Sequence, residues 1–204
     1  VNIIREDPKN ENILYLGTDV GVYVSLDAGE NWEALANGLP STFVHDLVIH
    51  PRDDIMVAAT HGQGMFAFDV RELQRLTADI IAQPAHLFAT DPGVLPTRGG
   101  GFGGPRPRGA WIHYWLGADA AMTLEVRDGD GETVARLDGP RTRGLHQVQW
   151  NLQRNAAGQG RSGIVGTGTY SVVLTVGGSE YATPLHVERR EGRGPHRGRE
   201  TPRR

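Results

Sequence analysis

The chain has 204 residues, of which 38% are hydrophobic and 22% charged, as in an ordinary globular protein. Its 28 Gly and 12 Pro favour short strands joined by turns, and the lack of Cys excludes disulfides, thiolate metal sites and Cys nucleophiles. The net charge of −3 combines a basic tail, residues 189–204, with an acidic remainder, which does not suggest a nucleic-acid-binding groove.

The first 70 residues contain an internal repeat with a period of 43 residues, or 42 in its middle part. "VNIIREDPKNENILYLGTDVGVYVSLD" begins at Val1 and "VHDLVIHPRDDIMVAATHGQGMFAFDV" begins at Val44. Each copy reads as a strand, a Pro-containing turn, a strand, a Gly turn and a strand, because its segments are rich in apolar and β-branched residues. A period of about 40 to 45 residues is that of a propeller blade.

The rest of the chain changes character twice. Residues 71–84 predict a short helical linker, in which Thr77 caps a turn and Pro84 ends it. Residues 85–188 predict a sandwich of six or seven strands, interrupted near its start by a Gly/Pro-rich loop at 90–109. Residues 189–204 lack an apolar face and are expected to be disordered.

The stretch "SLDAGENW", residues 25–32, predicts a hairpin staple. Ser25 and Asp27 can accept hydrogen bonds from backbone N–H groups of the turn, and Gly29 can take a positive φ. Trp32 is expected to fold back as a buried apolar anchor. Since the turn explains every residue type, Asp27 is interpreted as structural.

This stretch fits the Asp-box pattern S-x-D-x-G-x-x-W in full, and with the 43-residue period it makes residues 1–70 resemble the last blades of BNR-repeat propellers. These are exported bacterial proteins described as sortilin-like, VPS10-like or glycosyl-hydrolase-like. Residues 85–188 resemble the Ig-like domain of the flagellar hook-capping protein family through "LEVRDGDGETVARL", "GLHQVQWNL" and "GTGTYSVVLTV".

The resemblance implies an all-β protein: a partial β-propeller of one to two blades (1–70), the linker (71–84) and an Ig-like β-sandwich (85–188). Propellers close with about four to eight blades, and the second copy lacks the Asp box, so this chain is expected to be the C-terminal piece of a longer protein. Its expected partners are the upstream propeller blades of the parent chain, with carbohydrate or protein as further candidates. The expected location is secreted, periplasmic or cell-surface. The sequence contains no apolar run long enough to cross a membrane.

The expected function is that of a non-catalytic scaffold or interaction region, for which no cofactor and no metal are predicted. The alternative is part of a sialidase- or xyloglucanase-like glycoside hydrolase with its catalytic residues on upstream blades. Glycoside hydrolysis needs two positioned carboxylates, or a Tyr assisted by one. Asp19, Asp46 and Asp69 fall at turns or strand ends, but their spacing pairs none of them.

Four residues are candidates to face a ligand: His61 and Asp19 in the Gly turns, and Trp111 and Trp115 on one side of a strand. The two Trp rings suit either a sandwich core or a carbohydrate or domain contact. His45 and His50 are predicted on opposite faces, which argues against a shared metal. "DGDGE", 128–132, lacks the full EF-hand pattern and predicts a hairpin turn. Polyanion binding by the Arg-rich tail is a weaker hypothesis.

Overall fold

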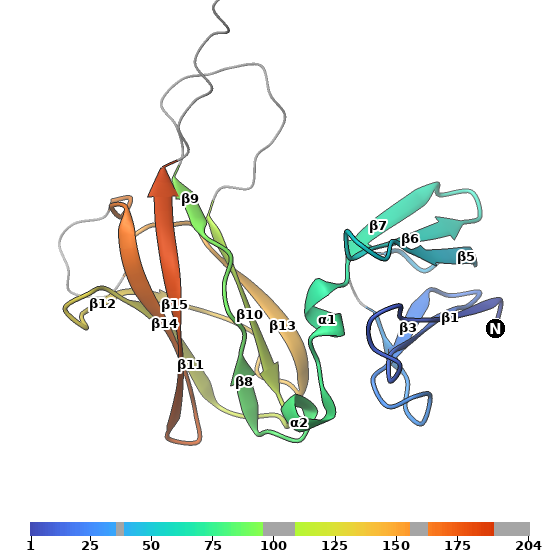
Figure 1. Cartoon of the computed structure of the whole chain (residues 1–204), viewed down its shortest axis with the longest axis horizontal. Helices are drawn as coiled ribbons and strands as arrows, with labels where there is room; N and C mark the ends of the chain where they lie inside the picture. Colours follow the sequence, from blue (N-terminus) through green and yellow to red (C-terminus); the bar gives the residue numbers. More distant parts are fainter. Residues whose placement is uncertain (36–38, 96–108, 156–162, 190–204) are drawn as a thin grey trace, which may run out of the picture. The chain divides into compact units, whose positions relative to one another are not determined.

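The computed structural model describes residues 1–35, 39–95, 109–155 and 163–189. The described part is an all-β structure of fifteen strands in several sheets, with two helices of four residues each. The chain divides into two compact units, which are described separately: unit 1 is Val1–Gln83 and unit 2 is Pro84–Arg204 (Figure 1). The basic tail, apart from Arg189, and residues 96–108 of the predicted Gly/Pro loop lie outside the described residues.

Unit 1 contains two antiparallel meanders, each with its strands in sequence order. The first meander consists of β1 (Ile3–Glu6), β2 (Leu14–Gly17), β3 (Val22–Ser25) and β4 (Glu33–Ala34). The second meander consists of β5 (Val44–Ile49), β6 (Ile55–Thr60) and β7 (Met65–Asp69). The strands of the two meanders therefore recur at the spacing of the sequence repeat.

The repeat extends to individual hydrogen bonds at the Gly turns. In the first meander, the backbone N–H and the hydroxyl of Thr18 both donate to the carbonyl of Gly21, at 2.9 and 3.0 Å. In the second, the N–H and hydroxyl of Thr60 donate to Gly64, at 3.0 and 2.7 Å. The Thr hydroxyl thus closes the same turn twice, and the extra residue in the second turn is accommodated between the same two anchors.

The core of unit 1 lies between the two meanders, where one face of each sheet is buried. The first meander contributes Tyr15, Val22 and Val24, and the second contributes Leu47, Met56, Ala58 and Phe68. Full burial of a side chain such as Leu47 or Met56 stabilises the fold by about 1.5–3 kcal/mol. Gly17 allows the close approach: a Cβ there would lie 2.6 Å from Ile3 Cγ2 and 2.9 Å from Val44 Cγ1.

The linker forms two short helices instead of one helical stretch, α1 (Arg71–Gln74) and α2 (Ala78–Ile81). The predicted cap is confirmed, since the Thr77 side chain accepts a hydrogen bond from the N–H of Ile80 at 3.3 Å. This bond opens a new helix at Ala78, which explains why the segment does not continue as one helix.

The described part of unit 2 contains eight strands in two sheets (Figure 1). The two sheets share one hydrophobic core. The strands are β8 (Ala85–Leu87), β9 (Gly93–Leu95), β10 (Ala110–Leu116), β11 (Met122–Arg127), β12 (Thr133–Leu137), β13 (Gly144–Trp150), β14 (Gly168–Val176) and β15 (Ser179–Arg189). The sheets run β13-β10-β8 and β12-β11-β14-β15-β9. The core draws on both, with Ile112 and Tyr114 from one sheet and Leu124, Val172 and Leu185 from the other.

The prediction of a continuous loop at 90–109 was wrong at Gly93–Leu95, which forms β9 and pairs in parallel with β15. Sequence reasoning misses this strand because it is three residues long and lies between two Pro residues. It forms because the long β15 offers it a partner, and because Gly93 fits where a Cβ would lie 2.9 Å from Leu152 Cδ2.

The edge of the five-stranded sheet at β12 is bonded by a side chain. Asn155 accepts a hydrogen bond from the N–H of Arg136 at 2.8 Å and donates one to the carbonyl of Arg136 at 3.1 Å. Its own N–H donates to the carbonyl of Val134 at 3.1 Å. Asn155 thus occupies backbone groups that an edge strand would otherwise present to another chain.

Candidate functional site

The turn at residues 25–32, after β3, is held by its own side chains, as predicted. The Ser25 hydroxyl accepts a 2.8 Å hydrogen bond from the N–H of Gly29, and Asp27 accepts bonds from the backbone and side-chain N–H groups of Asn31 at 2.8 and 2.7 Å. Gly29 has φ 98°, a left-handed conformation that favours glycine. Trp32 is half-buried rather than buried, because its indole N–H donates to the carbonyl of Gly29 at 3.1 Å and holds the ring beside the turn.

The carboxylate of Asp27 is committed to this turn. Hydrogen bonds from Asn31, followed by the one from Ser25, lower the pKa of Asp27 from 3.8 to about 2. A group held so firmly as an anion is a poor proton donor or acceptor near neutral pH. Its oxygens are also occupied by the turn, so Asp27 acts as a structural staple of this turn.

Asp19 and His61, predicted to face a ligand, are both exposed and stand at equivalent positions of the two Gly turns. Each meets a partner at the start of its own meander: Asn2 Nδ2 donates to Asp19 at 3.0 Å, and His45 Nε2 lies 3.1 Å from His61 Nδ1. Asn2 and His45 are themselves equivalent in the repeat. Phe43 lies against His45, with ring centroids 4.6 Å apart.

These two contacts are the functional candidates that sequence reasoning missed. His45, His50 and His61 form only a loose group in the sequence, and His50 lies elsewhere, with Nδ1 accepting a hydrogen bond from the N–H of Asp53 at 3.2 Å. The repeat was the sequence signal that could have predicted these contacts as an equivalent pair. An offset of 43 residues relates Asn2 to His45, and an offset of 42 relates Asp19 to His61. The end of unit 1 that bears the Gly turns therefore presents one repeated polar pair per meander.

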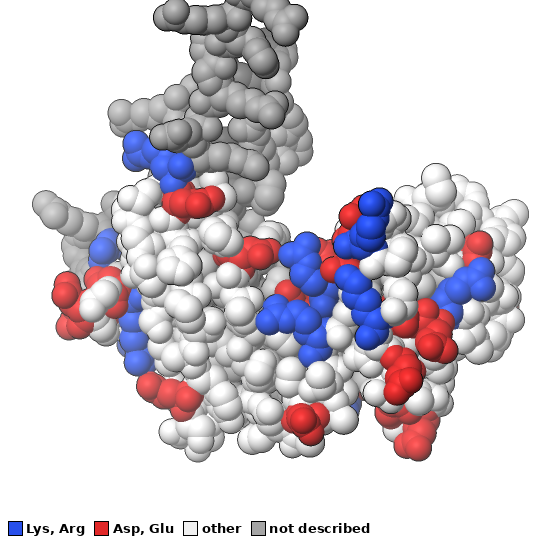
Figure 2. Space-filling view, viewed as in Figure 1, with Lys and Arg blue, Asp and Glu red and all other residues white. Residues whose placement is uncertain are grey.

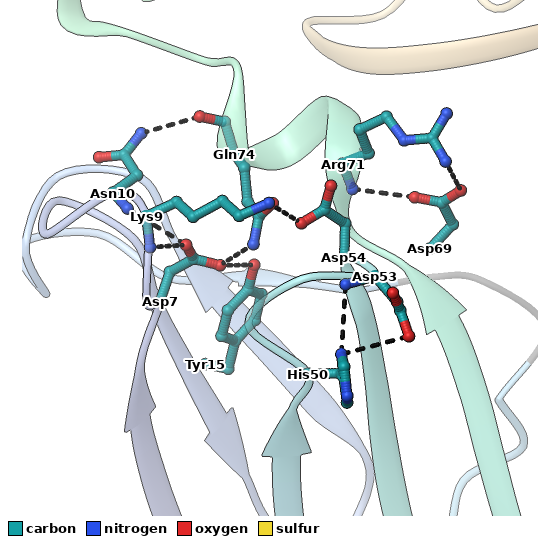
Figure 3. A network of polar contacts seen from close by, with 10 residues as sticks. All are labelled: Asp7, Lys9, Asn10, Tyr15, His50, Asp53, Asp54, Asp69, Arg71 and Gln74. Carbon is teal, nitrogen blue, oxygen red and sulfur yellow. Dashed lines mark hydrogen bonds and ion pairs between the residues drawn. The ribbon is translucent and has the colours of Figure 1, made fainter.

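A second polar cluster lies at the Pro turns and joins the first meander to α1 (Figure 3). The buried carboxylate of Asp7 accepts hydrogen bonds from the Tyr15 hydroxyl and Gln74 Nε2, both at 2.9 Å, and from the N–H groups of Lys9 and Asn10. Burial, then the charge of Asp7, raises the pKa of the Tyr15 phenol far above 10.0. A tyrosine beside a carboxylate, as in Tyr15 and Asp7, is the combination that a Tyr-dependent glycosidase uses. Here both side chains are buried and bonded to the scaffold.

The three carboxylates considered for glycoside hydrolysis have separate partners. Asp19 contacts Asn2, Asp46 forms an ion pair of 2.9 Å with Arg5, and Asp69 accepts a hydrogen bond from the N–H of Arg71 at 2.9 Å. No two of them share a contact in the described structure. This arrangement offers no positioned pair of acid and base.

The two Trp residues of β10 share the sheet face that lies away from the unit 2 core, but they differ in exposure. Trp111 is 39% exposed, whereas Trp115 is fully buried. The Arg143 guanidinium lies 5.4 Å from the centroid of the Trp115 ring, within the range of a cation–π contact. Of the two rings, only that of Trp111 has surface available to a ligand here.

The turn at 128–132 is the predicted hairpin, because Asp128 binds it from within. Asp128 Oδ1 accepts hydrogen bonds from the N–H groups of Asp130 and Glu132 at 3.2 and 3.0 Å. Among the described residues, no group of three or more His, Asp or Glu side chains is arranged to hold a metal ion.

A shallow groove of about 420 Å³ lies beside this turn on unit 2. It is lined by Asp128 and Gly129 and by the paired strands β14 and β15, with Thr169, Ser171, Ala182 and Pro184 among its walls. The groove contains a single carboxylate, which the hairpin already uses. Its walls therefore suit contact with an uncharged surface better than acid–base chemistry.

Charged side chains of opposite sign lie among each other on the face shown in Figure 2. On the outer side of β11, Glu125 bonds Arg127 at 3.2 Å and Arg136 at 3.0 Å, and Arg127 also reaches Glu180 at 2.9 Å. Burial alone would raise the pKa of Glu125, but these hydrogen bonds outweigh it and hold the pKa below its ordinary value. The cluster is balanced in charge, as expected for a solvated sheet face.

No protein-family model matches this chain, and no curated protein matches it significantly. In the described part of the chain, no helix has the length and apolar character needed to cross a membrane.

Proposed function

We propose that this chain is a non-catalytic scaffold and interaction region of a larger exported protein. In this proposal the two meanders of unit 1 are consecutive blades of a BNR-type propeller, and unit 2 is the Ig-like domain that follows it. The single observation that carries the proposal is the way in which the two meanders stack, because that stacking can be continued in both directions.

The two meanders stack head-to-tail. This becomes clear when the buried residues of one meander are compared with the equivalent residues of the other. The face of the first meander that meets the second carries Tyr15, Val22 and Val24. The equivalent residues of the second meander are Val57, Met65 and Ala67, and these lie on its far face. Each meander thus uses one face for the neighbour before it and the opposite face for the neighbour after it.

This geometry is that of a heterologous interface, which generates a ring when the rotation closes. A pair of meanders inside such a ring would have apolar residues on both outer faces, where further blades pack. The outer faces here contain Ile4, Leu16 and Tyr23 on one side and Val48, Val57 and Met65 on the other. Both faces therefore suit the upstream blades that the resemblance implies.

The proposed binding site is the end of unit 1 that bears the Gly turns. The first meander presents Asp19 there, beside the edge strand β1, and the second presents His61, beside the edge strand β5. A repeated array of exposed carboxylate, amide and imidazole groups can bind carbohydrate hydroxyls or a polar protein surface. Support for a non-catalytic role comes from the carboxylates, each of which is held by a separate partner.

The test is the coding sequence upstream of Val1 together with an activity assay. We expect further 43-residue copies with S-x-D-x-G-x-x-W turns upstream, and no hydrolysis of sialosides, xyloglucan or aryl glycosides by the 204-residue chain. An upstream sequence without such copies would overturn the propeller proposal. Glycosidase activity that Asp46→Asn or Asp69→Asn abolishes would overturn the non-catalytic assignment and favour the glycoside hydrolase alternative.

A further inference from the structure

Unit 1 exposes large apolar side chains on both of its outer sheet faces. On the outer face of the second meander, Met65 is 77% exposed and Val48 is 58% exposed. On the outer face of the first meander, Ile4 is 51% exposed beside the half-buried Leu16 and Tyr23. Two apolar sheet faces on one small unit are unusual for a surface that meets only water.

The molecule itself contains the template for covering them. Its internal interface joins the Tyr15 face of the first meander to the Leu47 face of the second. In the repeat, the outer face of the second meander is equivalent to the Tyr15 face of the first. The outer face of the first meander is equivalent to the Leu47 face of the second. The equivalent residues in this second comparison are Ile4 for Leu47, Leu14 for Met56, Leu16 for Ala58 and Tyr23 for Phe66. The two exposed faces are thus the two halves of an interface that already forms once within the chain.

We propose that a second copy of this chain docks on unit 1 head-to-tail, with the Val48 and Met65 face of one copy against the Ile4 and Tyr23 face of the next. The proposal rests on the stacking used above for the proposed function and concerns the 204-residue chain; in a longer chain, upstream blades would occupy the same faces in place of a second copy. Because the interface is heterologous, each copy keeps one face free after docking, and assembly can proceed beyond a dimer.

The side chains around the faces predict how this association responds to salt. Asp46 and Asp69 lie on the face of the second meander, and Glu6 lies on the face of the first. Arg5 pairs with Asp46 at 2.9 Å and Arg71 with Asp69 at 3.7 Å, so these two carboxylates are largely neutralised and apolar contact is the main force that favours docking. Association is therefore expected to persist as the salt concentration rises, the opposite of an assembly driven by charge attraction.

The experiment is sedimentation velocity on the full chain from about 1 to about 100 µM, a range in which concentration-dependent assembly is visible. Wild type is expected to gain mass with concentration to at least twice that of the monomer. Met65→Glu blocks one face and Ile4→Glu blocks the other, so each variant alone is expected to remain monomeric. The matched control is Val20→Glu, which changes an exposed apolar residue in the turn between β2 and β3 and should assemble like wild type.

Mixing the two blocked variants gives the decisive measurement. Each keeps the face that the other lacks, so an equimolar mixture is expected to form a 1:1 dimer and to stop there. The proposal is overturned if wild type stays monomeric, if either single variant still assembles, or if the mixture remains monomeric. Thermal unfolding confirms that each variant is folded, and Val48→Ser with Leu16→Ser provides a milder pair should a Glu variant fail this check.

These outcomes leave the proposed function separately testable. A monomeric wild type with intact unfolding would remove the docking of a second copy, while the upstream repeats would still decide the propeller proposal. Conversely, an upstream sequence without repeats would remove the propeller proposal and leave the association measurement unchanged.

Discussion

The phenol of Tyr15 donates a hydrogen bond of 2.9 Å to the buried carboxylate of Asp7. Asp7 in turn holds Gln74 of α1, so one carboxylate joins the first Pro turn, strand β2 and the start of the linker. Every donor around Asp7 belongs to the scaffold, which makes this cluster a determinant of stability.

Tyr15→Phe is expected to lower the free energy of unfolding at pH 7 by about 1 kcal/mol, the usual contribution of one hydrogen bond. Because burial and Asp7 raise the pKa of Tyr15 above 10.0, the phenol stays protonated in the folded state. The stability that this group contributes is complete below pH 10 and is lost as the pH rises further, since the unfolded chain then gives up the proton first. Urea unfolding between pH 7 and pH 11 measures both effects.

The matched control is Tyr23→Phe on β3, whose side chain lies on the other face of the same sheet. It should retain the alkaline loss of wild type, whereas Tyr15→Phe should lose part of it. Equal slopes in the two variants above pH 10 would contradict the role given to the Tyr15 proton.

Asp27→Asn is expected to destabilise the turn at residues 25–32 by about 1 kcal/mol, as the loss of a capping side chain does. Hydrogen bonds from Asn31 and Ser25 depress the pKa of Asp27 from 3.8 to about 2. Its contribution is therefore present above pH 4 and is lost as the pH falls from 4 to 2. Thermal unfolding across that range should show a smaller acid-dependent loss in Asp27→Asn than in wild type, with Asp130→Asn as the control.

Gly17→Ala is expected to cost about 1–3 kcal/mol, the range for overpacking a well-packed core. The added Cβ would lie 2.9 Å from Val44 Cγ1 of the second meander, besides 2.6 Å from Ile3 Cγ2 of its own meander, so the two meanders would have to separate. Gly129→Ala is the control, because a Cβ at that position meets nothing within 4 Å. Chemical denaturation that finds both variants equally stable would show that the meanders tolerate separation.

Much of this architecture could be predicted from local sequence. The 43-residue period places the strands of both meanders, and the residue types of the stretch 25–32 account for the hydrogen bonds of its turn. The Thr77 cap follows from a single side chain next to a short helical pattern. In each case the determining residues are close in the chain, or are repeated at a constant spacing.

The contacts that escaped prediction depend on strand register. Asp7 and Gln74 are 67 positions apart, and nothing in either segment indicates the other. His45 reaches His61 across the pairing of β5 with β6, whose register is irregular between Val44 and Asp46. The parallel pairing of β9 with β15 likewise depends on an edge that exists only after β15 has folded.

The side chain of Asn155 has a consequence for how this protein can associate. By bonding both backbone groups of Arg136, it fills a hydrogen-bonding position in which an incoming strand would extend the sheet into a fibril. Growth along the sheet is thereby hindered at β12, while the apolar faces of unit 1 remain open to neighbours. Assembly of this chain is thus directed toward stacking and away from strand addition at that edge.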